Sequence, residues 1–319
     1  MLRDMPLAEL REYQGGVADP EDFLEFWRAT LAEARAAAAP PRLEPVATPL
    51  TTVEIWDLTF SGFGGAPVKA WVRRPRGVAG PLPIVVTYVG YGGGRGLPAE
   101  SLLWASAGYV HVQMDSRGQG STWSLGVTPD PAGAGPAVAG QCTRGIESRE
   151  TYYYRRLFTD AVLAVDAARA LPFADPSRVG VMGLSQGGAM ALVAACLADG
   201  VKAAWAGVPF LCDIRRGAEA TDSRPYAEFA EYLACHRDRV DAVFQVLAYF
   251  DGVNFARHST TPIRLSAALM DEVVPASTVF AAHNHYAGPK DLLVWEFNGH
   301  EAGGAFEDAA ALEFFGAHI

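Results

Sequence analysis

The stretch Gly183-Leu184-Ser185-Gln186-Gly187 lies between an apolar strand-like run, residues 178–184, and a helix-forming run, residues 186–197. It has the pattern G-x-S-x-G, which places a serine in a sharp turn from strand to helix, where side chains at the glycine positions would clash. The turn exposes the hydroxyl above the sheet and puts the helix N-terminus beneath developing negative charge. Five residues alone are weak evidence, but the flanking strand and helix supply the expected context. We predict that Ser185 is a nucleophile.

Apolar strands and helices alternate on both sides of this turn. Such alternation is typical of a mostly parallel central sheet with helices on both faces. An antiparallel edge hairpin is expected before it, from two strands at 53–60 and 67–74 joined by a glycine-rich turn. The later strands are expected at 82–89, 109–114, 178–184, 262–270 and 291–297, and the helices at 98–107, 149–171, 186–197 and 276–286.

The remaining segments are expected to belong to the same single domain, 1–319. Asp19 followed by Pro20 predicts the start of a helix within an N-terminal helical arm, 1–50. Two insertions near the active site interrupt the alternation. One is the Gly-, Pro- and Ala-rich segment 122–148, and the other is the aromatic-rich segment 205–259.

Composition excludes several classes of protein. Half of the residues are hydrophobic and 19% are charged, so a large core can form, and the net charge of −10 argues against a nucleic-acid partner. Neither a signal peptide nor a bilayer-length apolar run is seen, so we expect no membrane partner and a cytoplasmic location. The cysteines lack metal-ligand spacing and are expected to be reduced and buried; they are Cys142, Cys196, Cys212 and Cys235.

A nucleophilic serine needs a base and a carboxylate that orients it. His300 follows the strand at 291–297 through an Asn-Gly turn, at the carboxyl edge where open α/β sheets bind ligands. Asp271 follows the strand at 262–270, with Glu272 as its rival. The order Ser, Asp, His is that of α/β hydrolases. We therefore predict an α/β-hydrolase fold with Ser185, Asp271 and His300 as the catalytic triad.

The oxyanion hole is expected from two backbone amides. One is that of Gln186, directly after the nucleophile, and the other is that of Tyr91, in the glycine-rich loop after the strand at 82–89. The same loop permits a second interpretation. Gly94-x-Gly96-x-x-Ala99, with Asp115 ending the next strand, satisfies the dinucleotide-binding pattern. A lone match of this kind is weak, and no separate substrate domain accompanies it.

Arg117 follows the strand at 109–114, at the same sheet edge. It could hold the active-site loops through hydrogen bonds, or it could simply pair with Asp115. Both interpretations stay open.

With these residues placed, the chain resembles carbohydrate esterase family 7, the acetyl xylan esterases and cephalosporin C deacetylases. The likeness covers almost the whole chain. Its matching stretches are Tyr91-Gly92-Gly93-Gly94-Arg95-Gly96, Arg117-Gly118-Gln119, Gly183-x-Ser185-Gln186-Gly187-Gly188, His300-Glu301, Thr143-Arg144-Gly145-Ile146, Tyr152-Tyr153-Tyr154-Arg155-Arg156, Val274-Pro275-Ala276-Ser277-Thr278-Val279-Phe280 and Asn284-His285-Tyr286-Ala287-Gly288-Pro289.

The resemblance implies a cytoplasmic esterase without metal or cofactor. It implies removal of acetyl groups from short xylo-oligosaccharides and from cephalosporins, with the triad and oxyanion residues named above. It also implies a homo-oligomer, a hexamer whose sites open inward.

Two rival functions stay open. A lipase or peptidase could use the same fold, and a non-catalytic relic could serve as a binding module. A relic tends to lose a triad member, whereas all three are present here, which favours the enzyme.

Overall fold

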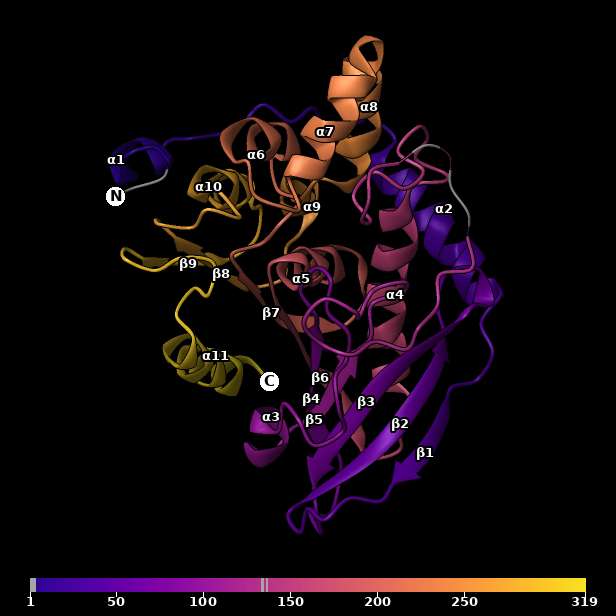
Figure 1. The fold of residues 1–319 in the computed structure, drawn as a ribbon. Coiled ribbons are helices and arrows are strands. Elements are labelled where there is room, and N and C mark those ends of the chain that lie inside the picture. Colours follow the sequence, from indigo (N-terminus) through magenta and orange to yellow (C-terminus); the bar gives the residue numbers. More distant parts are fainter. Residues whose placement is uncertain (1–3, 133–134, 136) are drawn as a thin grey trace.

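A nine-stranded sheet organises the computed structural model, which describes residues 4–132, 135 and 137–319 (Figure 1). The strand order is β1-β2-β3-β5-β4-β6-β7-β8-β9. The strands from β5 to β9 in this order run parallel, and β1, β2 and β3 form an antiparallel edge. This confirms the expected sheet and edge hairpin. The strands are β1 Arg42–Val46, β2 Val53–Ser61, β3 Pro67–Pro75, β4 Leu82–Tyr88, β5 Val110–Met114, β6 Ala174–Leu184, β7 Val201–Gly207, β8 Ile263–Ala268 and β9 Lys290–Trp295.

Helices cover both faces of the sheet. Alternate residues of a strand point to opposite faces. Ile84 of β4 therefore packs in the large core under α4 and α5, whereas Val85 packs in a second cluster with Trp104 of α3 and Phe315 of α11. The helices are α1 Leu7–Leu10, α2 Phe23–Ala36, α3 Leu103–Ser106, α4 Tyr153–Arg169, α5 Gln186–Leu197, α6 Ile214–Ala220, α7 Ala227–Cys235, α8 Val240–Leu247, α9 Gly252–His258, α10 Ala276–His285 and α11 Ala305–His318. Among the described residues, short 3-10 turns lie between β2 and β3 at Phe63–Gly65, between α7 and α8 at Arg237–Arg239, and between α8 and α9 at Ala248–Phe250. No helix among the described residues is both long and apolar enough to cross a bilayer.

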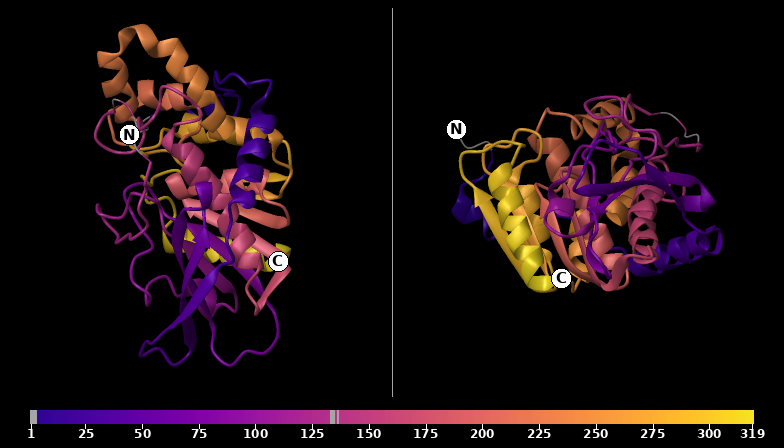
Figure 2. Two further views of the ribbon diagram at one scale, coloured as in Figure 1. Left: turned by 90° about the vertical axis from the view of Figure 1, so that its right-hand side faces the viewer. Right: turned by 90° about the horizontal axis from the view of Figure 1, so that it is seen from below.

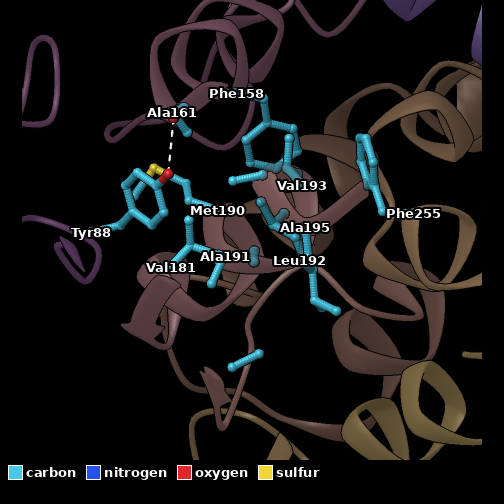
Figure 3. Close-up of a cluster of buried hydrophobic side chains, with 14 of the residues drawn as sticks. Tyr88, Phe158, Ala161, Val181, Met190, Ala191, Leu192, Val193, Ala195 and Phe255 are labelled. Atoms are coloured by element: carbon cyan, nitrogen blue, oxygen red, sulfur yellow. Dashed lines mark hydrogen bonds between the residues drawn. The ribbon is translucent and has the colours of Figure 1, made fainter. Parts of the chain in front are cut away.

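Helix α5 lies inside the core and carries the serine turn at its N-terminus. It is apolar on every side, as expected for a helix that is buried all round. Figure 3 shows Met190 and Val193 of this helix among Val181, Tyr88 and Phe158. The Tyr88 hydroxyl donates to the carbonyl of Ala161 in α4, so the single polar atom of that side chain is satisfied. A rigid core thus holds the start of α5 in place.

The N-terminal arm differs from expectation at both ends. Helix α2 begins at Phe23 instead of directly after Asp19, because the Asp19 carboxylate lies 3.2 Å from His258 and does not cap the helix. Arg42–Val46 of the expected arm forms β1, and Pro45 is tolerated there because β1 is an edge strand. Residues 1–3 of the arm lie outside the described residues.

Several expected elements differ from those in the structure. The insertion predicted at 205–259 begins inside strand β7, a short apolar run that periodicity alone could not separate from its surroundings. Helix α11 was not expected at all. The predicted helix at 98–107 is confined to Leu103–Ser106.

The two insertions fold over one end of the molecule. The segment 205–259 contributes helices α6 to α9, and its orange helices project beyond the body in Figure 2. The segment 122–148 forms turns and bends, of which residues 133, 134 and 136 lie outside the described residues.

Candidate active site

Ser185 occupies a strained turn between β6 and α5. Its φ of 57° and ψ of −121° are rare for a residue with a side chain, and such strain is typical of functional turns. The neighbouring glycines leave no room for a side chain. A Cβ on Gly183 would lie 2.3 Å from the backbone of Gly187, and one on Gly187 would lie 2.3 Å from the carbonyl of Tyr88. The glycine positions of the motif are therefore set by backbone contact.

Asp271 and His300 form a hydrogen-bonded pair in the loops after β8 and β9. Asp271 Oδ2 lies 2.8 Å from His300 Nδ1, and Oδ1 accepts from the backbone amides of Val273 and Val274. Because an ionised carboxylate can only accept, Nδ1 carries the proton and Nε2 is left to act as a base. The rival, Glu272, is exposed, and the carboxylate that lies 2.8 Å from His300 Nδ1 is that of Asp271. Asp271 lies three residues beyond the end of β8 at Ala268, whereas the predicted strand ran to residue 270 and ended directly before it.

Ser185 and His300 line the same cavity of about 910 Å³, together with Tyr91 and Trp123. In the described part of the chain, the Ser185 hydroxyl makes no hydrogen bond to His300. In unliganded enzymes such bonds are often long and tighten only around bound substrate. The structure thus brings the predicted nucleophile, base and orienting acid together at one cavity.

The peptide group between Tyr91 and Gly92 is hydrogen-bonded at both its carbonyl and its amide. The carbonyl of Tyr91 accepts from Trp123 Nε1 at 2.8 Å, and the next amide, that of Gly92, donates to Gln119 Oε1 at 2.7 Å. The loop also lies beside the nucleophile, since a Cβ on Gly90 would lie 4.0 Å from Ser185 Cβ. The Tyr91 backbone is therefore fixed next to the serine.

Gln186 links the serine turn to this loop through its buried side chain. Its Oε1 accepts from Gln119 Nε2 at 2.9 Å and from the hydroxyl of Tyr154 at 3.1 Å. Its Nε2 donates to the carbonyl of Val89 at 3.3 Å. Gln119 thus bonds both to Gln186 and to Gly92. The two predicted oxyanion donors, the amides of Tyr91 and Gln186, belong to segments that one amide network connects.

Arg117 does not pair with Asp115. Its guanidinium donates to Asp160 at 2.7 Å, lies 3.5 Å from Asp130, and is buried with both. Its carbonyl accepts from the hydroxyl of Tyr153 in α4. Arg117 therefore joins the loop after β5 to the scaffold, and Gln119 of the same loop bonds to Gly92 and Gln186.

Asp115 is also unsuited to the dinucleotide interpretation. Its carboxylate is fully buried and accepts from the amides of Arg95, Val127 and Thr128. A carboxylate that binds a ribose must be accessible, so Asp115 cannot serve a dinucleotide site. It instead holds the backbone of the neighbouring loops. No group of three His, Cys, Asp or Glu side chains within the described ranges gathers as metal ligands would.

Other predicted positions are resolved by burial. His111 is buried in β5, where burial lowers its pKa well below the ordinary value, and it bonds to Thr87. The cysteines are free, as expected, but two of the four are not fully buried: Cys196 is partly exposed, and Cys235 is exposed at the C-terminal end of α7. That part of the prediction was wrong.

Sequence reasoning missed Trp123 and Glu228, which both contact Tyr91. The available signal for Trp123 was a large aromatic residue within a Gly-rich insertion, and the structure leaves its side chain 62% exposed. For Glu228 no local signal exists, because it lies on an ordinary amphipathic helix.

Comparisons with known proteins agree on one family. The sequence model of acetyl xylan esterase matches residues 1–318. The solved acetyl xylan esterase of Paenibacillus sp. R4 is 36% identical, with a TM-score of 0.93 over 99% of this chain and 100% of that one. Acetyl xylan esterase 1 of Thermoanaerobacterium sp. JW/SL YS485 is 33% identical, with a TM-score of 0.90 over 98% of each chain. A curated relative, acetyl esterase Axe7A of Xylanibacter ruminicola, is 29% identical over 88% of this chain, which spans 64% of that relative's length.

Proposed function

The chain belongs to the acetyl xylan esterase family. We propose that it is a serine esterase that removes acetyl groups from small acetylated carbohydrates. The observation that carries the proposal is the pair of Asp271 and His300 at the cavity that Ser185 lines. A nucleophile on a strained turn, a base in a fixed tautomer and two amide donors are the groups that acyl transfer needs.

The proposed reaction proceeds through an acyl-enzyme. Ser185 attacks the ester carbonyl while His300 Nε2 takes the hydroxyl proton and then returns it to the leaving alcohol. Asp271 stabilises the imidazolium that forms. The amides of Tyr91 and Gln186 hold the oxyanion, and each such donor is typically worth about 3 kcal/mol of barrier. Water, activated by the same histidine, then releases acetate.

For the alcohol, we propose short xylo-oligosaccharides and, secondly, the acetylated side chain of cephalosporins. The cavity of about 910 Å³ has the size of a small-molecule site and is open enough for a bulky alcohol. The resemblance described from the sequence supports both substrates.

The test is initial-rate hydrolysis of p-nitrophenyl acetate, butyrate and octanoate, with Ser185→Ala as control. A strong preference for acetate that depends on Ser185 supports the proposal, and acetylated xylo-oligosaccharides and cephalosporin C are then assayed. Rates equal to those of Ser185→Ala for every ester contradict it, and a binding module takes its place. Labelling by a fluorophosphonate, which a relic should resist, checks this outcome.

A second candidate is an esterase of broader acyl range. The cavity extends past Ser185 to apolar side chains, among them Leu103, Trp104 and Met182. Such a surface could take a longer acyl chain, and faster hydrolysis of octanoate than of acetate would favour this candidate.

We also propose a cytoplasmic homo-oligomer, with a hexamer as the specific expectation from the family resemblance. Light scattering coupled to size exclusion measures the assembly, and fractionation of the producing cells measures the location. A monomer in solution would contradict the first, and recovery outside the cytoplasm the second.

A further inference from the structure

The Tyr91 hydroxyl lies in a buried polar cluster in the wall of the cavity. Its hydroxyl donates to Glu228 Oε1 at 2.8 Å and accepts from the amide of Gln141 at 2.5 Å. Burial raises the pKa of this phenol above its ordinary value, so the hydroxyl stays protonated and remains a donor. The residue whose backbone is proposed to hold the oxyanion is therefore anchored at its other end.

Glu228 binds two segments at once. It lies on α7 in the insertion 205–259 and is almost completely buried. While one oxygen accepts from Tyr91, the other accepts from the amide of Cys142 at 3.1 Å, in the insertion 122–148. Arg224 Nη1 lies 3.6 Å from the carboxylate and supplies a compensating charge. A buried carboxylate with these partners is costly to remove but holds its neighbours in defined positions.

The packing around this carboxylate leaves little freedom. Gly140 lies against it, and a Cβ at that position would come within 2.2 Å of Glu228 Oε1. The Arg224 side chain also reaches the carbonyl of Ala139. The loop after β4, both insertions and α7 thus meet at one side chain.

We propose that Glu228 is a positioning residue for the oxyanion hole, acting through the Tyr91 hydroxyl to set where the Tyr91 amide points. The inference rests on the proposed function. Glu228 belongs to the cavity lining, but it is only 1% exposed, and its two carboxylate oxygens already accept from the Tyr91 hydroxyl and the Cys142 amide. Plain structural support would affect substrate binding and catalysis alike. The proposed role of Glu228 instead stabilises the transition state, in which the oxyanion forms, and has little effect on binding of the ester.

The test compares Glu228→Gln, Tyr91→Phe and the double variant. Glutamine has the same shape but keeps only one acceptor oxygen, so either the Tyr91 hydroxyl or the Cys142 amide loses the oxygen to which it donates. Phenylalanine keeps the ring and the backbone amide of residue 91. We expect each single variant to lower kcat by about tenfold, less than the hundredfold typical of losing a donor outright, with KM within about twofold. The double variant should also lose about tenfold, because both changes break one linkage.

A boronic acid provides a second readout. It forms a tetrahedral adduct on the serine hydroxyl, with one oxygen in the oxyanion hole. Its affinity should fall by the same factor as kcat in all three variants. Asp251→Asn is the matched control, because Asp251 is another buried carboxylate in the same insertion that accepts backbone amides, from Asp213, Ile214 and Val253. It should change the melting temperature without changing kcat.

Three outcomes overturn the inference. They are wild-type kcat and boronate affinity in Glu228→Gln, multiplicative losses in the double variant, or a loss that merely follows the folded fraction as in Asp251→Asn. If Glu228→Gln does not fold, Tyr91→Phe alone decides, through kcat and boronate affinity. Wild-type protein and Ser185→Ala are run alongside. Equal rates for those two refute the proposed function, whereas Ser185-dependent hydrolysis with an unaffected Glu228→Gln refutes only the positioning role.

Discussion

Asp271 holds His300 through one oxygen, at 2.8 Å, while its other oxygen accepts from the amides of Val273 and Val274. This division fixes the orientation of the carboxylate independently of the histidine. It also determines how an asparagine side chain would be oriented at position 271.

Asp271→Asn should lower kcat by about a thousandfold to ten-thousandfold with little change in fold. The asparagine oxygen will turn toward the two backbone amides, so its NH₂ will face His300 Nδ1 and force the proton onto Nε2. The base is then in the wrong tautomer. Hydrolysis of p-nitrophenyl acetate measures the effect. Glu272→Gln is the neighbouring control and should keep nearly full activity; a comparable loss there would revive Glu272 as the orienting acid.

Trp123→Phe should lower kcat by about twofold to tenfold, the range of one neutral hydrogen bond. Phenylalanine retains a ring near Gly93 but cannot donate to the Tyr91 carbonyl. Steady-state kinetics with an alkyl acetate measures the change without aromatic stacking by the substrate. Trp56→Phe, in β2 and not part of the cavity lining, should leave kcat unchanged. An equal effect of both substitutions would contradict a specific role for the indole N–H.

Gly187→Ala should destabilise the fold by about 1–3 kcal/mol or more, because the new methyl group would meet the carbonyl of Tyr88 at 2.3 Å. Activity should fall as well, since β4 and α5 must separate beside the nucleophile. Urea unfolding measures the free energy. Gly16→Ala is the control, because nothing lies within 4 Å of a Cβ there. Equal stabilities of the two variants would show that the turn tolerates a side chain.

Asp251 should make stability depend on pH. Burial raises its pKa from 3.8 to about 7, with the nearby Asp213 carboxylate adding to the shift. The folded protein therefore binds this proton more tightly than the unfolded chain does. The contribution is fully present below about pH 4 and is lost as the pH rises through 7. Urea unfolding across this range should give a flatter pH dependence for Asp251→Asn than for the wild type; parallel curves would contradict the shifted titration.

One cysteine should react quickly with a thiol reagent in the native protein. Cys235 is exposed, whereas Cys142 and Cys212 are buried, and burial raises the pKa of Cys196 to about 12. The expected result is one fast thiol per chain, absent in Cys235→Ser and without effect on esterase activity. Release of nitrothiobenzoate from Ellman's reagent counts the thiols. Fast reaction of a second thiol would show that the buried cysteines are more accessible than the structure indicates.

Most of the fold could be predicted where a local pattern determines local structure. The serine turn, the edge hairpin and helix α5 were all expected within a residue or two, because glycine spacing and apolar runs act over short distances. Strand β7 and helix α11 were missed. Their apolar residues are buried by packing against Trp205 and other parts of the sheet, and neighbouring residues in the sequence do not reveal these contacts.

The sequence by itself determined the family and the sheet, and it predicted the candidate site residues Ser185, Asp271 and His300, because each follows a strand at the same carboxyl edge. Only the tertiary structure decided what holds them. It pairs Arg117 with Asp160 instead of with Asp115. It also brings Glu228 to Tyr91, which lies 137 positions earlier in the sequence. Such contacts depend on where whole helices pack. Once these polar side chains are buried, each one needs a hydrogen-bond partner.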